Sequence, residues 1–200
     1  MNRFLIGAAV VLASALCFAQ STPPAALPAL AIKPLAEKKI AELPAGPLYW
    51  RVENYPALEQ AQAAAGPTGL AVQAAGKAWL LTLGPKGGAT AGATPVAEIG
   101  PIPNVVATQY LLRINEASGR PGSVTPVHTH PGSETFFVLT GETSSRSPKG
   151  VLRVAAGQAR TGLGADVPMQ VSSSGATDLH SLVMFVVDAN RPFSSPAQLP

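Results

Sequence analysis

The residues of this sequence whose types and spacing could bind a metal lie together in one short run. His128 and His130 are two residues apart, so on a β-strand their side chains point to the same face, with Cα atoms about 6–7 Å apart. Glu134 follows a Pro-Gly pair that is typical of a turn, which would bring its carboxylate back toward the imidazoles. Two neutral nitrogens and one carboxylate oxygen suit Fe(II), Mn or Zn and leave coordination positions open. The alternative is a strand with two polar residues and no bound ion.

The same run resembles the first signature motif of the cupin superfamily. That motif reads Gly, five residues, His-x-His, three or four residues, Glu, six residues and Gly. Its fixed positions are all matched here, by Gly122, His128, His130, Glu134 and Gly141. The resemblance covers roughly residues 105–192 and implies a single double-stranded β-helix, or jelly-roll, barrel. It also implies a divalent transition metal, Mn, Fe or Zn, held by the two histidines and the glutamate.

The second signature motif of the family, which supplies a third histidine ligand, is degenerate in this chain. Its best counterpart runs from Gly157 to Val171 and places Met169 where the histidine belongs. As a ligand, the Met169 thioether would favour copper, because soft sulfur prefers Cu(I). Alternatively, Met169 fills the space of the lost imidazole and water completes the metal's shell, or it packs in the core with no metal nearby.

His180 is the remaining histidine, eleven residues after Met169. A tight hairpin around Ser174 and Gly175 would pair His180 with Met169 and make it a replacement ligand. The jelly-roll topology that the resemblance implies puts these two strands in opposite sheets, which favours an exposed strand histidine instead.

Other side chains are weaker candidates around the proposed site. Phe136, Val138 and Leu182 are expected to line the barrel beside the ion and form an apolar pocket. Tyr110 or Arg113 would orient a substrate, and an ordinary surface role for Arg113 is the equal alternative.

The N-terminal residues 1–19 are typical of a secretory signal peptide. Arg3 gives a positive end, and residues 4–16 form an apolar run shorter than the ~20 residues that span a bilayer. Small residues at Cys17 and Ala19 predict cleavage after Ala19, export to the periplasm or the medium, and no stable membrane insertion afterwards. A lipoprotein modified at Cys17 ranks second and an uncleaved anchor third. Cleavage would remove the only cysteine, leaving neither a disulfide nor a thiolate ligand.

Composition argues against a nucleic-acid partner. Charged residues make up 12% of the chain, against about 25% in typical soluble proteins, and the net charge is +3. The only adjacent basic pair is Lys38-Lys39, so the high isoelectric point reflects few acids and not a basic patch. A small molecule is the expected partner.

Many short strands separated by Gly, Pro and Ser turns predict an all-β fold. Residues 20–46 are rich in Pro and Ala and indicate an extended linker with one helical turn around 35–43. Residues 47–196 form the barrel with an N-terminal strand extension, in which 48–103 adds strands to the barrel's edge. The expected elements are a strand at 49–52, one short helix at 56–65, a hairpin of 70–75 and 77–83, and strands at 95–99, 107–114, 124–130, 134–139, 151–154, 169–172 and 179–187.

The sequence supports three functions. The first is an exported metal-binding cupin, a dioxygenase-like oxidoreductase or an isomerase acting on a small organic molecule. The second is a non-catalytic periplasmic module that binds or senses a metal or small ligand, and the third is a barrel whose site has decayed. The intact first motif favours the first function, and the lack of a catalytic acid or base beyond the ligands favours the second. A homodimer through edge strands stays open.

Overall fold

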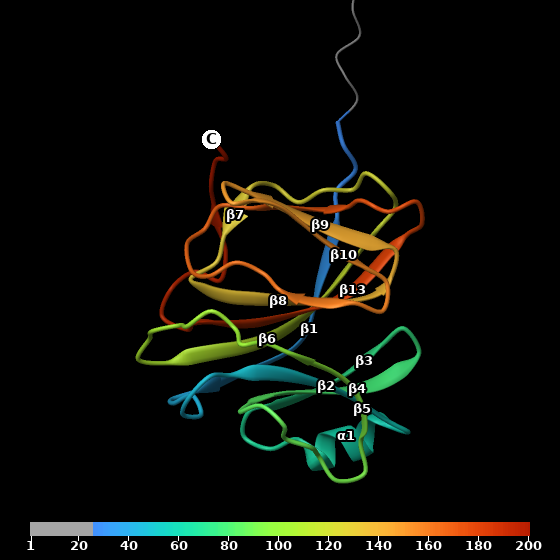
Figure 1. Ribbon diagram of the computed structural model, residues 1–200, viewed down its shortest axis with the longest axis vertical. Helices are drawn as coiled ribbons and strands as arrows, with labels where there is room; N and C mark the ends of the chain where they lie inside the picture. Colours follow the sequence, from blue (N-terminus) through green and yellow to red (C-terminus); the bar gives the residue numbers. More distant parts are fainter. Residues whose placement is uncertain (1–25) are drawn as a thin grey trace, which may run out of the picture.

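Antiparallel strands stacked in three layers make up most of the described chain (Figure 1). A computed structural model describes residues 26–200, so the expected signal peptide lies outside the described residues. The middle layer is a five-stranded sheet in the order β1 (Ala31–Ile40), β6 (Tyr110–Gly119), β13 (Leu179–Asp188), β8 (Gly132–Thr140) and β11 (Ala159–Thr161).

The other two layers cover opposite faces of this middle sheet. On one face lies the three-stranded sheet of β10 (Gly150–Ala155), β9 (Glu142–Ser147) and β12 (Gln170–Ser173), accompanied by the short pair of β14 (Ser195–Pro196) and β7 (His128–Thr129). On the other lies the four-stranded sheet of β3 (Gly69–Ala74), β4 (Lys77–Gly84), β2 (Tyr49–Tyr55) and β5 (Thr94–Ile99), with the single short helix α1 (Leu58–Ala64).

Strand β13 shows how the middle sheet serves both interfaces. Its residues alternate between two apolar clusters: Leu182 and Met184 pack toward the four-stranded sheet, whereas Val183 and Phe185 pack toward the three-stranded sheet. Alternation with a period of two is what a strand buried on both faces requires. The middle and three-stranded sheets enclose the second cluster as a jelly-roll barrel, which confirms the predicted all-β double-stranded β-helix.

The expected linker at 20–46 is wrong for residues 31–40. Residues 31–40 form β1, which pairs with β6 along its whole length, and no helical turn forms at 35–43. Pro34 is accommodated because β1 is an edge strand and its register shifts between Pro34 and Ala36. The edge of the middle sheet beside β6 is therefore occupied by β1.

The segment 48–103 consequently has a different place from the one expected. It forms strands, as predicted, but they build a separate sheet over the outer face of the middle sheet and do not extend its edge. The local predictions within it are confirmed. The helix is α1, and the hairpin of β3 and β4 turns at Ala75 and Gly76, which both have positive φ as a two-residue hairpin turn requires.

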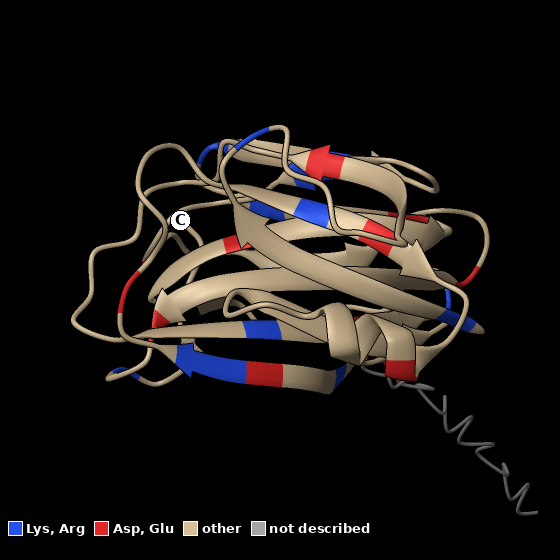
Figure 2. Ribbon diagram, turned by 90° about the horizontal axis from the view of Figure 1, so that it is seen from below, with Lys and Arg blue, Asp and Glu red and all other residues tan. Residues whose placement is uncertain are grey.

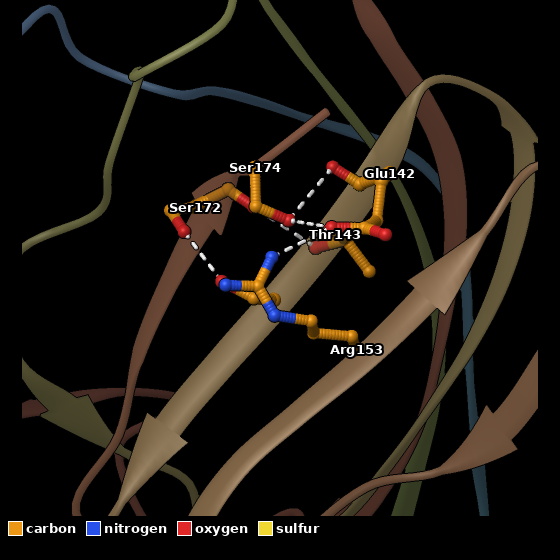
Figure 3. Close-up of polar contacts among 6 residues, drawn as sticks. Glu142, Thr143, Arg153, Ser172 and Ser174 are labelled. Carbon is orange, nitrogen blue, oxygen red and sulfur yellow. Dashed lines mark hydrogen bonds and ion pairs between the residues drawn. The ribbon is translucent and has the colours of Figure 1, made fainter. Parts of the chain in front are cut away.

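Strand β9 was missed because it is polar, and polar contacts hold it in place (Figure 3). The Glu142 carboxylate accepts hydrogen bonds from Arg153 on β10 at 2.8 Å and from Ser174 at 2.7 Å. Both hydrogen bonds lower the pKa of Glu142, and the one from Ser174 has the larger effect. The hydroxyls of Ser144 and Ser172 join β9 to β12 at 2.8 Å.

Charged residues of both signs are interspersed on the face seen in Figure 2. The edge strand β1 carries Lys33, Glu37 and Lys38, and charges on an exposed edge oppose pairing with other chains. Within residues 26–200, no helix has the length and apolar character needed to cross a membrane.

Candidate metal and ligand site

A cavity of about 400 Å³ opens between the middle and three-stranded sheets. All three residues of the His-His-Glu set line it, on a wall that is otherwise mainly apolar. The lining residues are Ile32, Asn115, Ala117, Thr125, Pro126, Val127, His128, His130, Glu134, Phe136, Val171, Val183, Phe185, Phe193, Ser194 and Pro196.

Two prolines limit the strand that carries the histidines. The predicted strand at 124–130 is reduced to β7, because Pro126 has no N–H and Pro131 ends the extended segment. His128 is held from one side by two backbone hydrogen bonds with Met169, at 2.8 and 2.9 Å. From the other side, β14 pairs with β7.

Both imidazoles are oriented by backbone carbonyls. Nδ1 of His128 lies 2.9 Å from the carbonyl oxygen of Pro126, and Nδ1 of His130 lies 2.6 Å from that of Phe193. A carbonyl only accepts, so each Nδ1 carries the hydrogen, and in the neutral form of either ring the lone pair is on Nε2. A histidine that binds a metal through Nε2 uses this tautomer. The ring centroids are 4.9 Å apart, with the planes at 81°.

His130 is the more deeply buried of the two rings. It packs against Phe185 and Phe193, with centroid distances of 4.9 and 4.7 Å. Burial, the largest cause, lowers the pKa of His130 to about 4, although the hydrogen bond to Phe193 acts in the opposite direction. The ring is therefore neutral near pH 7, as a metal ligand must be.

Glu134 is a buried carboxyl group on β8. It is 2% exposed, and its Oε1 has no hydrogen-bond partner. Burial raises the pKa of Glu134 to about 8. The side chain lies against Gly162, where an added Cβ would come within 2.8 Å of Glu134 Cγ and 3.1 Å of Oε1. The missing side chain of Gly162 therefore provides the space that the carboxyl group occupies.

These residues fit a metal in donor chemistry but not yet in arrangement. Two free imidazole nitrogens and a buried carboxylate oxygen without a partner are suitable ligands. As the side chains stand, however, no group of three His, Cys, Asp or Glu residues within 26–200 is gathered so as to hold a metal ion. The carboxyl group of Glu134 would have to turn from Gly162 toward the rings.

Met169 lies opposite His128, where the resemblance places the third ligand. Its side chain is 1% exposed, belongs to the apolar cluster of the barrel and is not part of the cavity wall. This placement favours the packing interpretation over the thioether ligand.

The hypothesis that His180 replaces the third ligand is wrong. β12 pairs with β9, whereas β13 pairs with β6 and β8, so no hairpin brings His180 beside Met169. The His180 side chain is 47% exposed, and its Nδ1 lies 3.7 Å from Glu116.

Phe136 lines the cavity as expected, but Leu182 faces the opposite interface of the middle sheet. Sequence reasoning missed Asn115 and Phe193, which also line it. Phe193 is 63 positions from His130, so only the folded chain reveals their contact.

No protein-family model and no curated protein sequence matches the chain. Solved structures with similar folds include a cupin-like protein from Thermotoga maritima, at 13% identity over 44% of this chain and 65% of its own, with a TM-score of 0.39. The polyketide cyclase RemF from Streptomyces resistomycificus matches at 21% identity over 44% of this chain and 62% of its own, with a TM-score of 0.37. The DMSP lyase DddQ from Ruegeria pomeroyi matches at 20% identity over 43% of each chain, with a TM-score of 0.37.

The matched regions thus span 43–65% of the lengths of these three proteins. Similarity at this level concerns the fold alone. The sheet topology and the five matched motif positions define the class: a double-stranded β-helix protein that resembles the cupins.

Proposed function

We propose that the protein is an exported cupin that binds one divalent transition metal beside a cavity for a small organic molecule. The observation that carries this proposal is the convergence of two oriented imidazoles and an unpartnered buried carboxyl group on one cavity. A cation bound there would stabilise the ionised form of Glu134, which burial otherwise disfavours.

In this proposal His128 and His130 hold the metal through Nε2, and Glu134 completes the set after turning from Gly162. Mn, Fe or Zn match these nitrogen and oxygen donors, whereas copper would call for the sulfur of Met169. When bound, the metal would supply Lewis-acid or redox chemistry. The apolar wall would exclude water from a bound molecule, and the carbonyls of Pro126 and Phe193 would keep the rings in position. By the motif resemblance, the reaction is that of a dioxygenase-like oxidoreductase or an isomerase.

A non-catalytic binding module is the second candidate function. Within residues 26–200, the only titratable side chains that line the cavity are the three candidate ligands, and this observation favours a binding role. A module of this kind would hold a metal or a small ligand for delivery or sensing.

Export is part of the proposal and rests on residues 1–19 alone. Protein isolated from the periplasmic fraction of a Gram-negative host is expected to begin at Gln20. Intact-mass measurement checks this, and a chain that retains residues 1–19 or carries a lipid on Cys17 would contradict it.

Metal analysis tests the proposal. Wild type purified from the exported fraction is expected to hold close to one equivalent of Mn, Fe or Zn, and His130→Ala to lose it. His180→Ala, which removes an exposed histidine outside the cavity, is the matched control and should keep the metal. A wild type that holds no more metal than His130→Ala after reconstitution would exclude the site. Oxygen consumption with a panel of phenols and enols then separates an oxidoreductase from a binding module.

A further inference from the structure

Asn115 gives the cavity a polar group that the metal proposal does not use. It lies on β6, is 2% exposed and lines the cavity. Arg113 donates from Nε to Asn115 Oδ1 at 2.9 Å. Because this nitrogen can only donate, the amide atom that faces it is the oxygen, and the orientation of the amide is fixed.

The Nδ2 group of Asn115 is consequently left to the cavity. It donates no hydrogen bond to any residue within 26–200. Oε1 of Glu134 is sealed from solvent and has no hydrogen-bond partner, whereas Nδ2 of Asn115 keeps some accessible surface. A buried amide with two hydrogens to donate and access to a cavity is suited to an acceptor atom of a bound molecule.

Arg113, the cationic partner of Asn115, has two further contacts of its own. The Arg113 guanidinium lies over the Phe193 ring at 4.3 Å and forms an ion pair with Glu37 at 3.5 Å. It is not part of the cavity wall. In the metal-free protein, an anionic ligand would therefore be buried without an opposite charge, which is unfavourable.

The rest of the wall sets the size and polarity of the ligand. Side chains such as Ile32, Ala117, Val183 and Phe185 present hydrocarbon to the cavity. Its volume of about 400 Å³ lies within the range of ~300–1,000 Å³ for small-molecule sites. At ~30 Å³ per water molecule in the liquid, the space corresponds to about 13 waters, or a ligand of roughly ten to fifteen non-hydrogen atoms.

We infer that the cavity accepts a neutral, largely apolar organic molecule with one acceptor oxygen, and that Nδ2 of Asn115 donates a hydrogen bond to that oxygen. Asn115 thereby determines specificity. The inference deepens the proposed function, because it rests on small-molecule binding in the same cavity, but it does not require the metal.

A pair of probes that differ in the oxygen tests the inference. 4-Phenylbutan-2-one and butylbenzene are titrated by NMR into protein treated with a chelator. Wild type is expected to bind the ketone about five- to tenfold more tightly than the hydrocarbon. Asn115→Leu should bind the two equally, with its affinity for butylbenzene within about twofold of wild type. Asn115→Asp keeps the side-chain size but replaces the donor with an acceptor, and it should also lose the preference.

Equal affinities of wild type for the two probes, or binding of neither, would overturn the inference. So would a preference for the ketone that persists in both Asn115 variants. The wild-type comparison does not depend on the folding of any variant. Because the protein is treated with a chelator, this test is separate from the metal proposal. The metal analysis can fail while the preference for the ketone is observed, and the preference can be absent while the metal binds.

Discussion

At the scale of single residues, the two histidines are prepared by their surroundings for one role. Each Nδ1 is hydrogen-bonded to a backbone carbonyl, so in the neutral form of either ring the lone pair is on Nε2. Burial keeps His130 neutral near pH 7. Glu134 has the opposite property, because it is a carboxyl group held where its ionised form has no partner.

Glu134 therefore makes the stability of the metal-free protein depend on pH. Its folded pKa of about 8 lies above the ordinary 4.5, so the folded state retains a proton that the unfolded state releases. Stability from this group is present below pH 4.5 and is lost as the pH rises toward 8. Glu134→Gln is expected to be more stable than wild type by roughly 3 kcal/mol at pH 7, and by almost nothing near pH 4.5.

Urea unfolding between pH 4.5 and 9, with a chelator present, measures this difference. Glu59→Gln on α1 is the matched control, since that glutamate is exposed. A stability difference between wild type and Glu134→Gln that stays constant across the pH range would contradict the account.

At this scale, the sequence predicts the site residues that are close together in the chain and misses those whose contacts span a long stretch of it. The spacing of His128, His130 and Glu134 was sufficient to place all three on one cavity, because they belong to one short run. Asn115 and Phe193 carry no local signal, since their roles arise only when β6 and the C-terminal segment meet the same cavity.

At the scale of elements, the C-terminal segment covers the histidines. β14 pairs with β7, and the Phe193 ring packs on His130 and Phe185. Arg191 donates two hydrogen bonds to Asp166, at 2.6 and 3.0 Å, and so ties this segment to the loop before β12.

Removing the Phe193 ring should change the titration of His130. Burial is the largest cause of the low pKa, so Phe193→Ala is expected to raise the pKa of His130 from about 4 toward 6.5. The imidazole C–H signals in an NMR titration of the metal-free protein report this change. Val106→Ala, at a position that is 85% exposed, is the control variant. An unchanged His130 titration in Phe193→Ala would show that the segment does not shield the ring.

The strands β1 and β9, which sequence reasoning missed, share one cause. β1 contains Pro34 and several charges, and β9 is almost entirely polar, so neither shows the alternation of apolar residues that identifies a strand. Both depend on pairing with a partner strand, β6 for the first and β12 and β10 for the second. The apolar strands β8 and β13 were found because they are buried on both faces.

At the scale of the whole molecule, the added four-stranded sheet and the barrel share one apolar cluster. Leu112 and Met184 of the middle sheet pack in the same cluster as Trp50 and Trp79 of the added sheet. Separating the two would expose apolar surface at a cost of about 25 cal/mol per Å². The layers are therefore expected to unfold together.

Denaturant unfolding tests this coupling. Trp50 and Trp79 are the only tryptophans, so fluorescence reports the added sheet, while far-UV circular dichroism reports the strands of all layers. The two signals are expected to give coincident transitions. A fluorescence change at a lower denaturant concentration than the circular dichroism change would show that the added sheet is a separate unit.

The most direct measurement of the central claim is a crystal structure of the protein soaked in MnCl₂, with anomalous difference density. The account predicts one peak bonded to Nε2 of both His128 and His130, at metal-ligand distances, with the Glu134 carboxylate turned from Gly162 to the ion. Density with no peak at the imidazoles, or with Glu134 still against Gly162 beside an ion held only by the rings, would contradict it.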